Sequence, residues 1–416
     1  MLKHVLTIIK NQYRSNSWLF AELLIVSFCF WYIIDYTGIL QSMKNAPLGF
    51  NIDNTYRIEL AERISESEGY INPENKKTTS GEDLIAIVER LRQSPDIESV
   101  SLSISSQPYS SAKFGGIFKQ IMFQDSVGIR AQEYKVTSSF FEVFNICLNK
   151  TGDRISGNML DNNSIIISAD TEELLTGMSN NMKKTVFIGK DNTSKQIVAV
   201  STPIRKSEYT KHNPCFFSLL TTEEITSANN ISDIQVCIRT KPDLAPNFLE
   251  EFTSNIANQL NIGNIYLLEI CPTYAIRKNV VQGETSQILT NSLLLFFLSV
   301  NIFFGISGTF LFRTRQRQGE IGLRLAVGST KTNILKIFIT EGILLLIIAF
   351  IPMMVIAFNV GIAELVNLEW IDFTWVRFAT SIFTAFILLT FVIIASIWYP
   401  AQKASGIPPV EALRDE

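Results

Sequence analysis

Three long stretches of this sequence carry no charged side chain, and they constrain the fold more than any other feature. The stretches cover residues 288–312, 342–363 and 378–402, which are 25, 22 and 25 residues long. A helix needs about 20 apolar residues to cross the hydrocarbon core of a bilayer, and helices buried inside soluble domains seldom reach this length without a charge. We therefore predict transmembrane helices at 288–312, 342–363 and 378–400.

A fourth apolar stretch near the N-terminus, from Ser17 to Ile34, is interrupted only by Glu22. A cleaved signal peptide is the alternative interpretation. The long aromatic-rich run, the internal acid and the lack of a small-residue cleavage site favour a retained transmembrane helix at 17–35. An ionised acid within hydrocarbon costs on the order of a few kcal/mol, so Glu22 either pairs across the helix bundle or reaches the inner interface.

The distribution of lysine and arginine predicts the orientation of these helices. Residues 1–16 contain three basic side chains and no acid, and residues 313–341 contain six basic and two acidic side chains, a net charge of 6 − 2 = +4. Basic segments stay in the cytoplasm, so we place 1–16, 313–341 and the tail 401–416 inside and the acidic loop 364–377 outside. Residues 36–287 then form one large extracytoplasmic domain.

The extracytoplasmic domain shows both helical and strand periodicity, which predicts a mixed α+β fold. Alternating strands flank a helix twice, once near each end of the domain, and form two β-α-β units. Their elements are expected at 56–60, 81–94, 97–104, 234–238, 248–260 and 265–270. Further short strands are expected between them, at 129–137, 164–168, 185–189 and 196–201. We predict two subdomains, one from the two ends of the domain and one from this insertion.

Composition argues against several classes of activity. Charged residues make up 18 % of the chain, below the roughly 25 % of soluble domains, and the net charge of −3 provides no basic field for nucleic acid. Only two histidines and no Cys-x-x-Cys pair occur, which disfavours a catalytic triad or a metal site. The residues around Gly328 lack the spacing of a phosphate-binding loop. We expect no cofactor, no metal and no catalytic residue in this chain.

Four cysteines fall in the extracytoplasmic domain, where many bacteria oxidise thiols: Cys147, Cys215, Cys237 and Cys271. Cys237 and Cys271 lie in or beside two strands of the second β-α-β unit, which are candidates for neighbouring strands. A disulfide between them and free buried thiols are both open alternatives. Cys29 lies in the first transmembrane stretch and is expected to be unpaired.

The basic segment 313–341 contains sequence motifs that a helix bound only to anionic lipid would not require. It contains the motif EIGLR followed by AVG, within residues 320–328. The stretch predicts an amphipathic helix whose apolar side chains face lipid or protein: Leu323, Leu325 and Val327. A break at Gly328 is expected to turn the chain back toward the next transmembrane helix.

At these residues the chain resembles the FtsX-like, or MacB-type, ABC transporter permeases. The resemblance rests on the motifs within 320–328 and on the ending YPAQKASGIPPVEALR at 399–414, and more loosely on FFEVF at 140–144 and IIIS at 165–168. One helix, a large external domain and three further helices follow one another as in this family. The resemblance implies a MacB-like periplasmic core domain and a location in the bacterial inner membrane.

The resemblance also implies a set of site residues. In this family, the coupling segment 313–341 would contact a separate ABC ATPase dimer, which binds the ATP and Mg²⁺. The residues concerned are Arg317, Glu320, Ile321, Gly322, Arg324, Ala326 and Gly328. A C-terminal family motif comprises Pro400, Ala401, Pro409, Glu411, Ala412, Leu413 and Arg414.

The resemblance implies further partners, namely a second permease chain, identical or different, and in export systems a periplasmic adaptor and an outer-membrane channel. The second predicted helix carries small and amide residues that favour close helix contact: Asn301, Gly305 and Gly308. These residues either pack against another helix, including one of a second chain, or are glycines and amides that lipid tolerates.

Two classes of function follow from the resemblance. The first is a permease that transmits ATP-driven motion across the membrane for export or efflux of a drug, a peptide or a lipoprotein. The second is a regulatory mechanotransmitter that controls a periplasmic wall hydrolase or a sensor kinase. A membrane-anchored enzyme is the least favoured alternative.

Overall fold

A computed structural model of the 416-residue chain describes residues 7, 9, 13–110, 117–123, 128–176, 183–189, 191–228, 230–242, 248–257, 259–363, 365 and 371–406. The chain divides into two compact units. A membrane unit comprises Met1–Lys44 and Gly283–Glu416, and an external unit comprises Asn45–Gln282. The bounds of the external unit, 45–282, lie near those of the predicted extracytoplasmic domain, 36–287.

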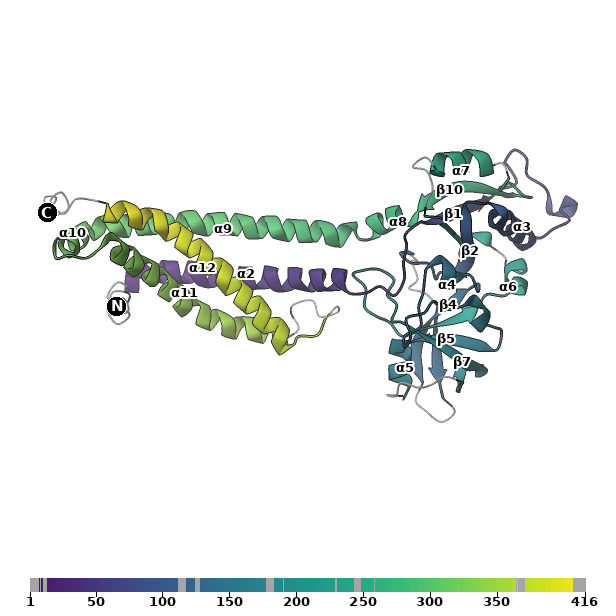
Figure 1. Ribbon diagram of the computed structural model, residues 1–416, viewed down its shortest axis with the longest axis horizontal. Helices are drawn as coiled ribbons and strands as arrows, with labels where there is room; N and C mark the ends of the chain where they lie inside the picture. The colour runs from purple at the N-terminus through teal and green to yellow at the C-terminus, as the bar shows by residue number, and fades with distance from the viewer. Residues whose placement is uncertain are drawn as a thin grey trace. The chain divides into compact units, whose positions relative to one another are not determined.

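The membrane unit contains four long helices, labelled in Figure 1: α2 (Tyr13–Asn45), α9 (Gln282–Gln316), α11 (Lys331–Ile362) and α12 (Trp375–Ser405). All four are long and apolar enough to cross a membrane, as the sequence predicts. Each extends beyond its predicted apolar stretch, because a helix continues through polar residues as long as its backbone hydrogen bonds are satisfied. A shorter helix, α10 (Gln318–Ala326), connects α9 to α11.

The core of the membrane unit is formed by apolar side chains from all four long helices. Close approach of α11 and α12 depends on Gly342, because a Cβ atom there would lie 2.2 Å from Cδ1 of Ile397. The indole nitrogen of the fully buried Trp31 on α2 donates a hydrogen bond of 3.1 Å to the hydroxyl of Ser381 on α12. The bundle therefore combines dry packing with a buried polar contact between the helices α2 and α12, among others.

One half of the external unit contains both predicted β-α-β sequences. They are β1 (Thr55–Glu62), α3 (Ser80–Gln93) and β2 (Ile97–Ile104), then β9 (Ile234–Thr240), α7 (Phe248–Ile256) and β10 (Ile265–Pro272). Helix α3 begins with a capping box formed by Thr79 and Glu82. The strand order is β10-β1-β9-β2, with antiparallel neighbours. The two units are thus interleaved, and neither pairs its own two strands.

The other half of the external unit is a closed barrel of six strands. These are β3 (Ile117–Met122), β4 (Ile129–Val136), β5 (Ser164–Ser168), β6 (Thr185–Ile188), β7 (Thr193–Ser201) and β8 (Cys215–Leu219). Each strand pairs with the next in the order β4-β3-β6-β7-β5-β8, and β8 pairs with β4 again. The sequence pattern did not predict strands β3 and β8.

The two halves share one sheet but have separate cores. Strand β2 pairs with β4 through Ser103 and Ile104, which joins all ten strands of the described sheet. The apolar core under α3 and α7 is distinct from the clusters in and around the barrel. Short helices α4 (Phe140–Val143), α5 (Ala169–Thr176), α6 (Thr222–Thr226) and α8 (Thr273–Val280) complete the unit. The predicted mixed α+β fold is confirmed.

All five cysteines are free in the structure. Cys237 and Cys271 are not on neighbouring strands, because Arg57 on β1 pairs with both of them from the position between β9 and β10. Strands two positions apart lie about 9.6 Å from each other, beyond the reach of a disulfide. The disulfide alternative is therefore wrong for this pair. Burial raises the pKa of the Cys215 and Cys237 thiols to about 12.

Candidate functional site

The junction of α9, α10 and α11 contains a buried carboxylate held by two arginines. Glu341 on α11 is 0 % exposed. Its Oε1 accepts a hydrogen bond of 2.9 Å from Nη1 of Arg313 near the end of α9, and its Oε2 accepts one of 3.0 Å from Nη1 of Arg317. Because a buried charge needs partners that compensate for lost hydration, these contacts hold the three segments in one arrangement.

Arg317 also extends this contact to the short helix α10. Its Nε donates to Oε2 of Glu320 at 3.2 Å, and Glu320 accepts a further hydrogen bond from Arg324 one turn later. The alternating series Arg313–Glu341–Arg317–Glu320–Arg324 is called the arginine–glutamate ladder below. It is buried at Glu341 and accessible to solvent at Glu320, whose side chain is 42 % exposed.

The residues between α10 and α11 end the first helix and begin the second, and this turn positions the arginine–glutamate ladder. Gly328 has a φ of +101°, a conformation that favours glycine. The amides of Gly328 and Ser329 donate to the carbonyls of Leu325 and Arg324, which ends α10. Thr330 then caps α11 by accepting a hydrogen bond from the amide of Asn333. The turn predicted at Gly328 is thus confirmed.

The predicted coupling residues divide between two faces of α10. Ile321 and Gly322 are buried, and Ile321 packs with Ile334 and Phe338 in the core of the membrane unit. Ala326 and Gly328 are exposed.

The apolar side chains of this segment also divide. Leu323 is 56 % exposed and Val327 is 82 % exposed. Leu325 instead packs against the core, which is the protein-facing alternative of the prediction. A single substitution at either Leu323 or Val327 therefore alters the exposed face without disturbing the core.

Glu320 has partners within its own chain, which changes the interpretation of the basic segment. Within residues 313–336 the sequence presents Glu320 as the one acid among several cations, available to a cationic partner protein. In the structure its carboxylate already contacts Arg317 and Arg324. Any partner at this position meets a paired acid, with apolar Leu323 and Val327 exposed beside it.

Only part of the C-terminal motif is described by the structure. Pro400 and Ala401 lie in α12, and Ala401 is fully buried in the core of the membrane unit. The remaining motif residues lie outside the described residues: Pro409, Glu411, Ala412, Leu413 and Arg414.

The predicted intramembrane acid lies against α9. A Cβ atom at Gly305 would be 2.8 Å from Oε1 of Glu22, so the glycine leaves room for this carboxyl group between the two helices. Asn301 and Gly308 are exposed, and no atom lies within 4 Å of a Cβ built at Gly308. Of these three positions, Gly305 is therefore the one where the absence of a side chain allows a close contact within this chain.

A second buried ion pair was not predicted from the sequence. Asp35 on α2 is 3 % exposed, and both of its oxygens accept hydrogen bonds of 3.1 Å from Nε of Arg377 in the first turn of α12. Arg377 also donates to the carbonyl of Ile371 at 2.8 Å. In the sequence, each of these two charged residues lies at the end of an apolar stretch, which was the available signal for an ion pair. That signal does not identify the partners, because 342 positions separate the two residues.

No group of three or more histidine, cysteine or acidic residues placed to hold a metal ion occurs within the described parts of the chain.

Comparison with known proteins identifies the membrane part of the chain. Residues 292–409 match the family described as FtsX-like permease C-terminal. The pyoverdine export ATP-binding/permease protein PvdT of Pseudomonas savastanoi pv. phaseolicola is 30 % identical over 112 residues, and that of Pseudomonas syringae pv. syringae is 29 % identical over 115 residues. Each alignment covers 27 % of this chain and 16 % of the relative, so the chain spans only a small part of these curated proteins.

Solved structures similar to this chain are isolated extracytoplasmic domains. The periplasmic region of MacB from Actinobacillus actinomycetemcomitans is 15 % identical and covers 56 % of this chain and 94 % of its own, with a TM-score of 0.36. The extracellular domain of the noncanonic ABC-type transporter YknZ from Gram-positive bacteria is 15 % identical and covers 52 % of this chain and 100 % of its own, with a TM-score of 0.34.

The residues that match the family include the arginine–glutamate ladder and the helices α11 and α12. The resemblance predicted from the motifs within 320–328 and 399–414 is confirmed over this region. Residues 292–409 of this chain are thus similar to the FtsX-like permease C-terminal family.

Proposed function

We propose that this chain is the permease subunit of a mechanotransmission-type ABC transporter, which transmits the motion of a separate ATPase dimer across the inner membrane. The ATPase would bind the ATP and Mg²⁺, and the external unit would receive the motion in the periplasm. The family of residues 292–409 supports a permease. The names of the curated relatives, which are export proteins, favour export or efflux of a drug, a peptide or a lipoprotein.

One observation carries this proposal: α10 is fixed to two long helices on one side and exposes apolar side chains on the other. The ladder ties α10 to α9 and α11 through Arg317, Glu320 and Glu341. A short helix held in this way moves together with the long helices instead of bending away from them. Leu323 and Val327 offer an apolar surface of the kind that docks into a groove of a partner.

A second permease chain is proposed to pack on α9. In the most apolar 18 residues of α9, 17 % of the residues are buried within the chain. In the corresponding segments of the other three long helices the buried share is 33 %. Asn301, Phe304 and Gly308 lie on one exposed face of this helix. Cysteines at position 308 should cross-link between chains in native membranes, whereas cysteines at Val355, which is exposed on α11, should not. Equal cross-linking at both positions would argue against a dimer through this face.

The coupling role is tested with the Leu323→Asp variant. A charge on the exposed face of α10 should greatly reduce co-purification of the ATPase subunit, recognised by its phosphate-binding loop, and abolish permease-stimulated ATP turnover. The matched control is Leu174→Asp, since Leu174 on α5 of the external unit is 59 % exposed, close to the 56 % of Leu323. Both variants should insert into the membrane at the level of the parent.

The result that refutes the coupling role is Leu323→Asp with parental assembly and turnover. Loss of both properties in Leu174→Asp as well would show a general effect of the added charge. A periplasmic adaptor and an outer-membrane channel are proposed as further partners.

A further inference from the structure

The barrel of the external unit has an open mouth at one end. Strands β4 and β8 end there, at Lys135 and Ser218, and strands β5 and β7 begin there, near Ile165 and Lys195. Strands β3 and β6 pair through Ile121 and Met122, so the earlier residues of β3 extend beyond the end of β6 at Ile188. Mouths of β-barrels are frequent ligand sites, because strands diverge there while the far end stays packed.

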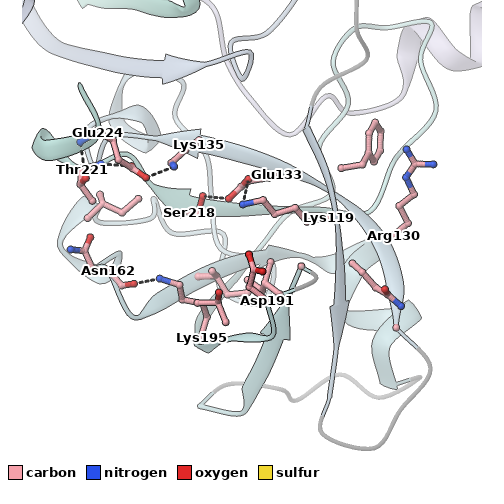
Figure 2. A pocket seen from close by; sticks show the side chains of 18 residues that line it. Lys119, Arg130, Glu133, Lys135, Asn162, Asp191, Lys195, Ser218, Thr221 and Glu224 are labelled. Atoms are coloured by element: carbon pink, nitrogen blue, oxygen red, sulfur yellow. Dashed lines mark hydrogen bonds and ion pairs between the residues drawn. The ribbon is translucent and has the colours of Figure 1, made fainter. Parts of the chain in front are cut away.

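A cleft of about 810 Å³ occupies this mouth, within the range of roughly 300–1,000 Å³ that ligand pockets have. Figure 2 shows the side chains that line it. Its accessible apolar lining includes the exposed Phe118 and the half-buried Leu219. Charged and polar side chains make up much of the remaining lining, so the cleft offers both apolar and charged surface.

The carboxylates inside the mouth already accept hydrogen bonds on both oxygens. Glu133 accepts from the hydroxyl of Ser218 at 2.8 Å and from Nζ of Lys119 at 2.8 Å. Glu224 accepts from Nζ of Lys135 and from the amide of Thr221, the latter at 3.1 Å. These contacts are drawn as dashed lines in Figure 2. Both carboxylates are thus already paired with a lysine.

The lysines, by contrast, retain donor capacity. An ammonium group has three N–H donors. Among the described contacts, Lys119 and Lys135 each donate to one carboxylate, and Lys195 donates to the neutral backbone oxygen of Asn162. Among the described contacts, Lys195 is therefore the one of these three lysines that no carboxylate contacts directly, and its charge interacts with that of Asp161 only at longer range.

The outer rim carries two more charges. The guanidinium of Arg130 lies 4.9 Å from the centre of the Phe118 ring, and Asp191 is exposed on the rim. With Lys119, Lys135 and Lys195, the cations among the described residues that line the cleft number four, against the three acids Glu133, Asp191 and Glu224, a sum of 4 − 3 = +1. The rim is thus slightly cationic as well as rich in donors.

We propose that the mouth of this barrel binds an amphipathic anion. The carboxylate or phosphate group of this anion accepts hydrogen bonds from Lys195 and Lys119, and its apolar part contacts Phe118 and Leu219. This binding site does not depend on the proposed coupling to an ATPase, because every residue of the site belongs to the external unit.

The experiment uses the full chain in lipid nanodiscs and four probes that share one alkyl chain. Hexanoate, hexyl phosphate, hexylamine and hexanol are compared by saturation-transfer NMR, with the signal from empty nanodiscs subtracted. At least one of the two anions should bind saturably, and the amine and the alcohol should bind about tenfold more weakly or not at all. The preferred anion distinguishes a carboxylate ligand from a phosphate ligand.

Three variants locate the binding. Lys195→Gln removes the charge but keeps a donor for Asn162, and should weaken anion binding about tenfold. The matched control Lys77→Gln changes an exposed lysine outside the cleft and should leave binding unchanged. Thr193→Trp fills the mouth from an exposed position at the start of β7 and should abolish binding with all cations intact.

Equal binding of all four probes, or parental anion binding by Thr193→Trp, would overturn the proposal. If Lys195→Gln does not fold, as judged by circular dichroism, Thr193→Trp decides alone. No saturable binding of either anion by the parent chain also refutes the proposal.

Discussion

Replacing Glu341 by glutamine should destabilise the membrane unit far more than the same change at Glu320. Glu341 is fully buried between Arg313 and Arg317, whose side chains are nearly buried as well. The amide of glutamine accepts a hydrogen bond with its oxygen, but its NH₂ group meets the other guanidinium, and both arginines lose their counter-charge. Removing one partner from a buried ion pair costs about 3–5 kcal/mol.

Glu320 occupies the solvent-accessible end of the same ladder. Its pairs with Arg317 and Arg324 are half exposed, and exposed ion pairs contribute only about 0–1 kcal/mol. The Glu320→Gln variant should therefore lose less than about 1 kcal/mol of unfolding free energy, against about 3 kcal/mol or more for Glu341→Gln. The two variants make the same chemical change, so burial alone distinguishes them.

Equilibrium unfolding in mixed detergent micelles measures this difference. All five tryptophans of the chain lie in the membrane unit, so intrinsic tryptophan fluorescence reports the unfolding of that unit. A triple variant, Arg313→Met and Arg317→Met with Glu341→Leu, should recover stability to within about 1 kcal/mol of the parent, because apolar replacement of a whole buried ionic group is often neutral. Equal losses in Glu320→Gln and Glu341→Gln would refute the reasoning.

Three further predictions concern other parts of the chain. Asp35→Asn should lower the unfolding free energy of the membrane unit by about 3 kcal/mol, measured by the same fluorescence assay, because Arg377 is left without its buried counter-charge; a loss below about 1 kcal/mol would contradict this. After replacement of the native thiols, a cysteine at Ser194 should react with a membrane-impermeant reagent from outside and one at Gln318 should not, and the reverse result would contradict the predicted orientation. Burial raises the pKa of Cys215 from its ordinary 9.0 to about 12, so only the unfolded chain ionises this thiol in that range, and the unfolding free energy of the external unit should fall as the pH rises from about 9 to about 12. Circular dichroism against denaturant at increasing pH checks this, and Cys215→Ala should reduce the slope.

The sequence alone determined those features of this protein that depend on neighbouring residues. An uncharged run such as 342–363 is apolar around its whole circumference, and only a transmembrane helix satisfies its backbone groups in lipid. The strands 97–104 and 164–168 were predicted with the bounds that the structure has. The turn at Gly328 also follows from local conformation.

Strands β3 and β8 were not predicted, because their strand structure depends more on pairing with distant segments than on the alternation of apolar and polar residues in their own sequence. Strand β8 spans five residues between β4 and β5 and contributes to two different clusters, through Phe216 and Phe217. Closure of the barrel requires pairing between segments that are distant in the sequence, such as β4 with β8. The charged mouth exists only once that closure brings the strand ends together.

Tertiary structure alone decided which charges meet. The sequence contains the members of the ladder, but nothing local distinguishes Glu341, which is fully buried, from Glu320, which is exposed. Asp35 and Arg377 meet only because α2 and α12 pack together. The physical reason is that helix and strand formation depends on short-range backbone geometry and local hydrophobicity, whereas an ion pair depends on how the finished elements pack.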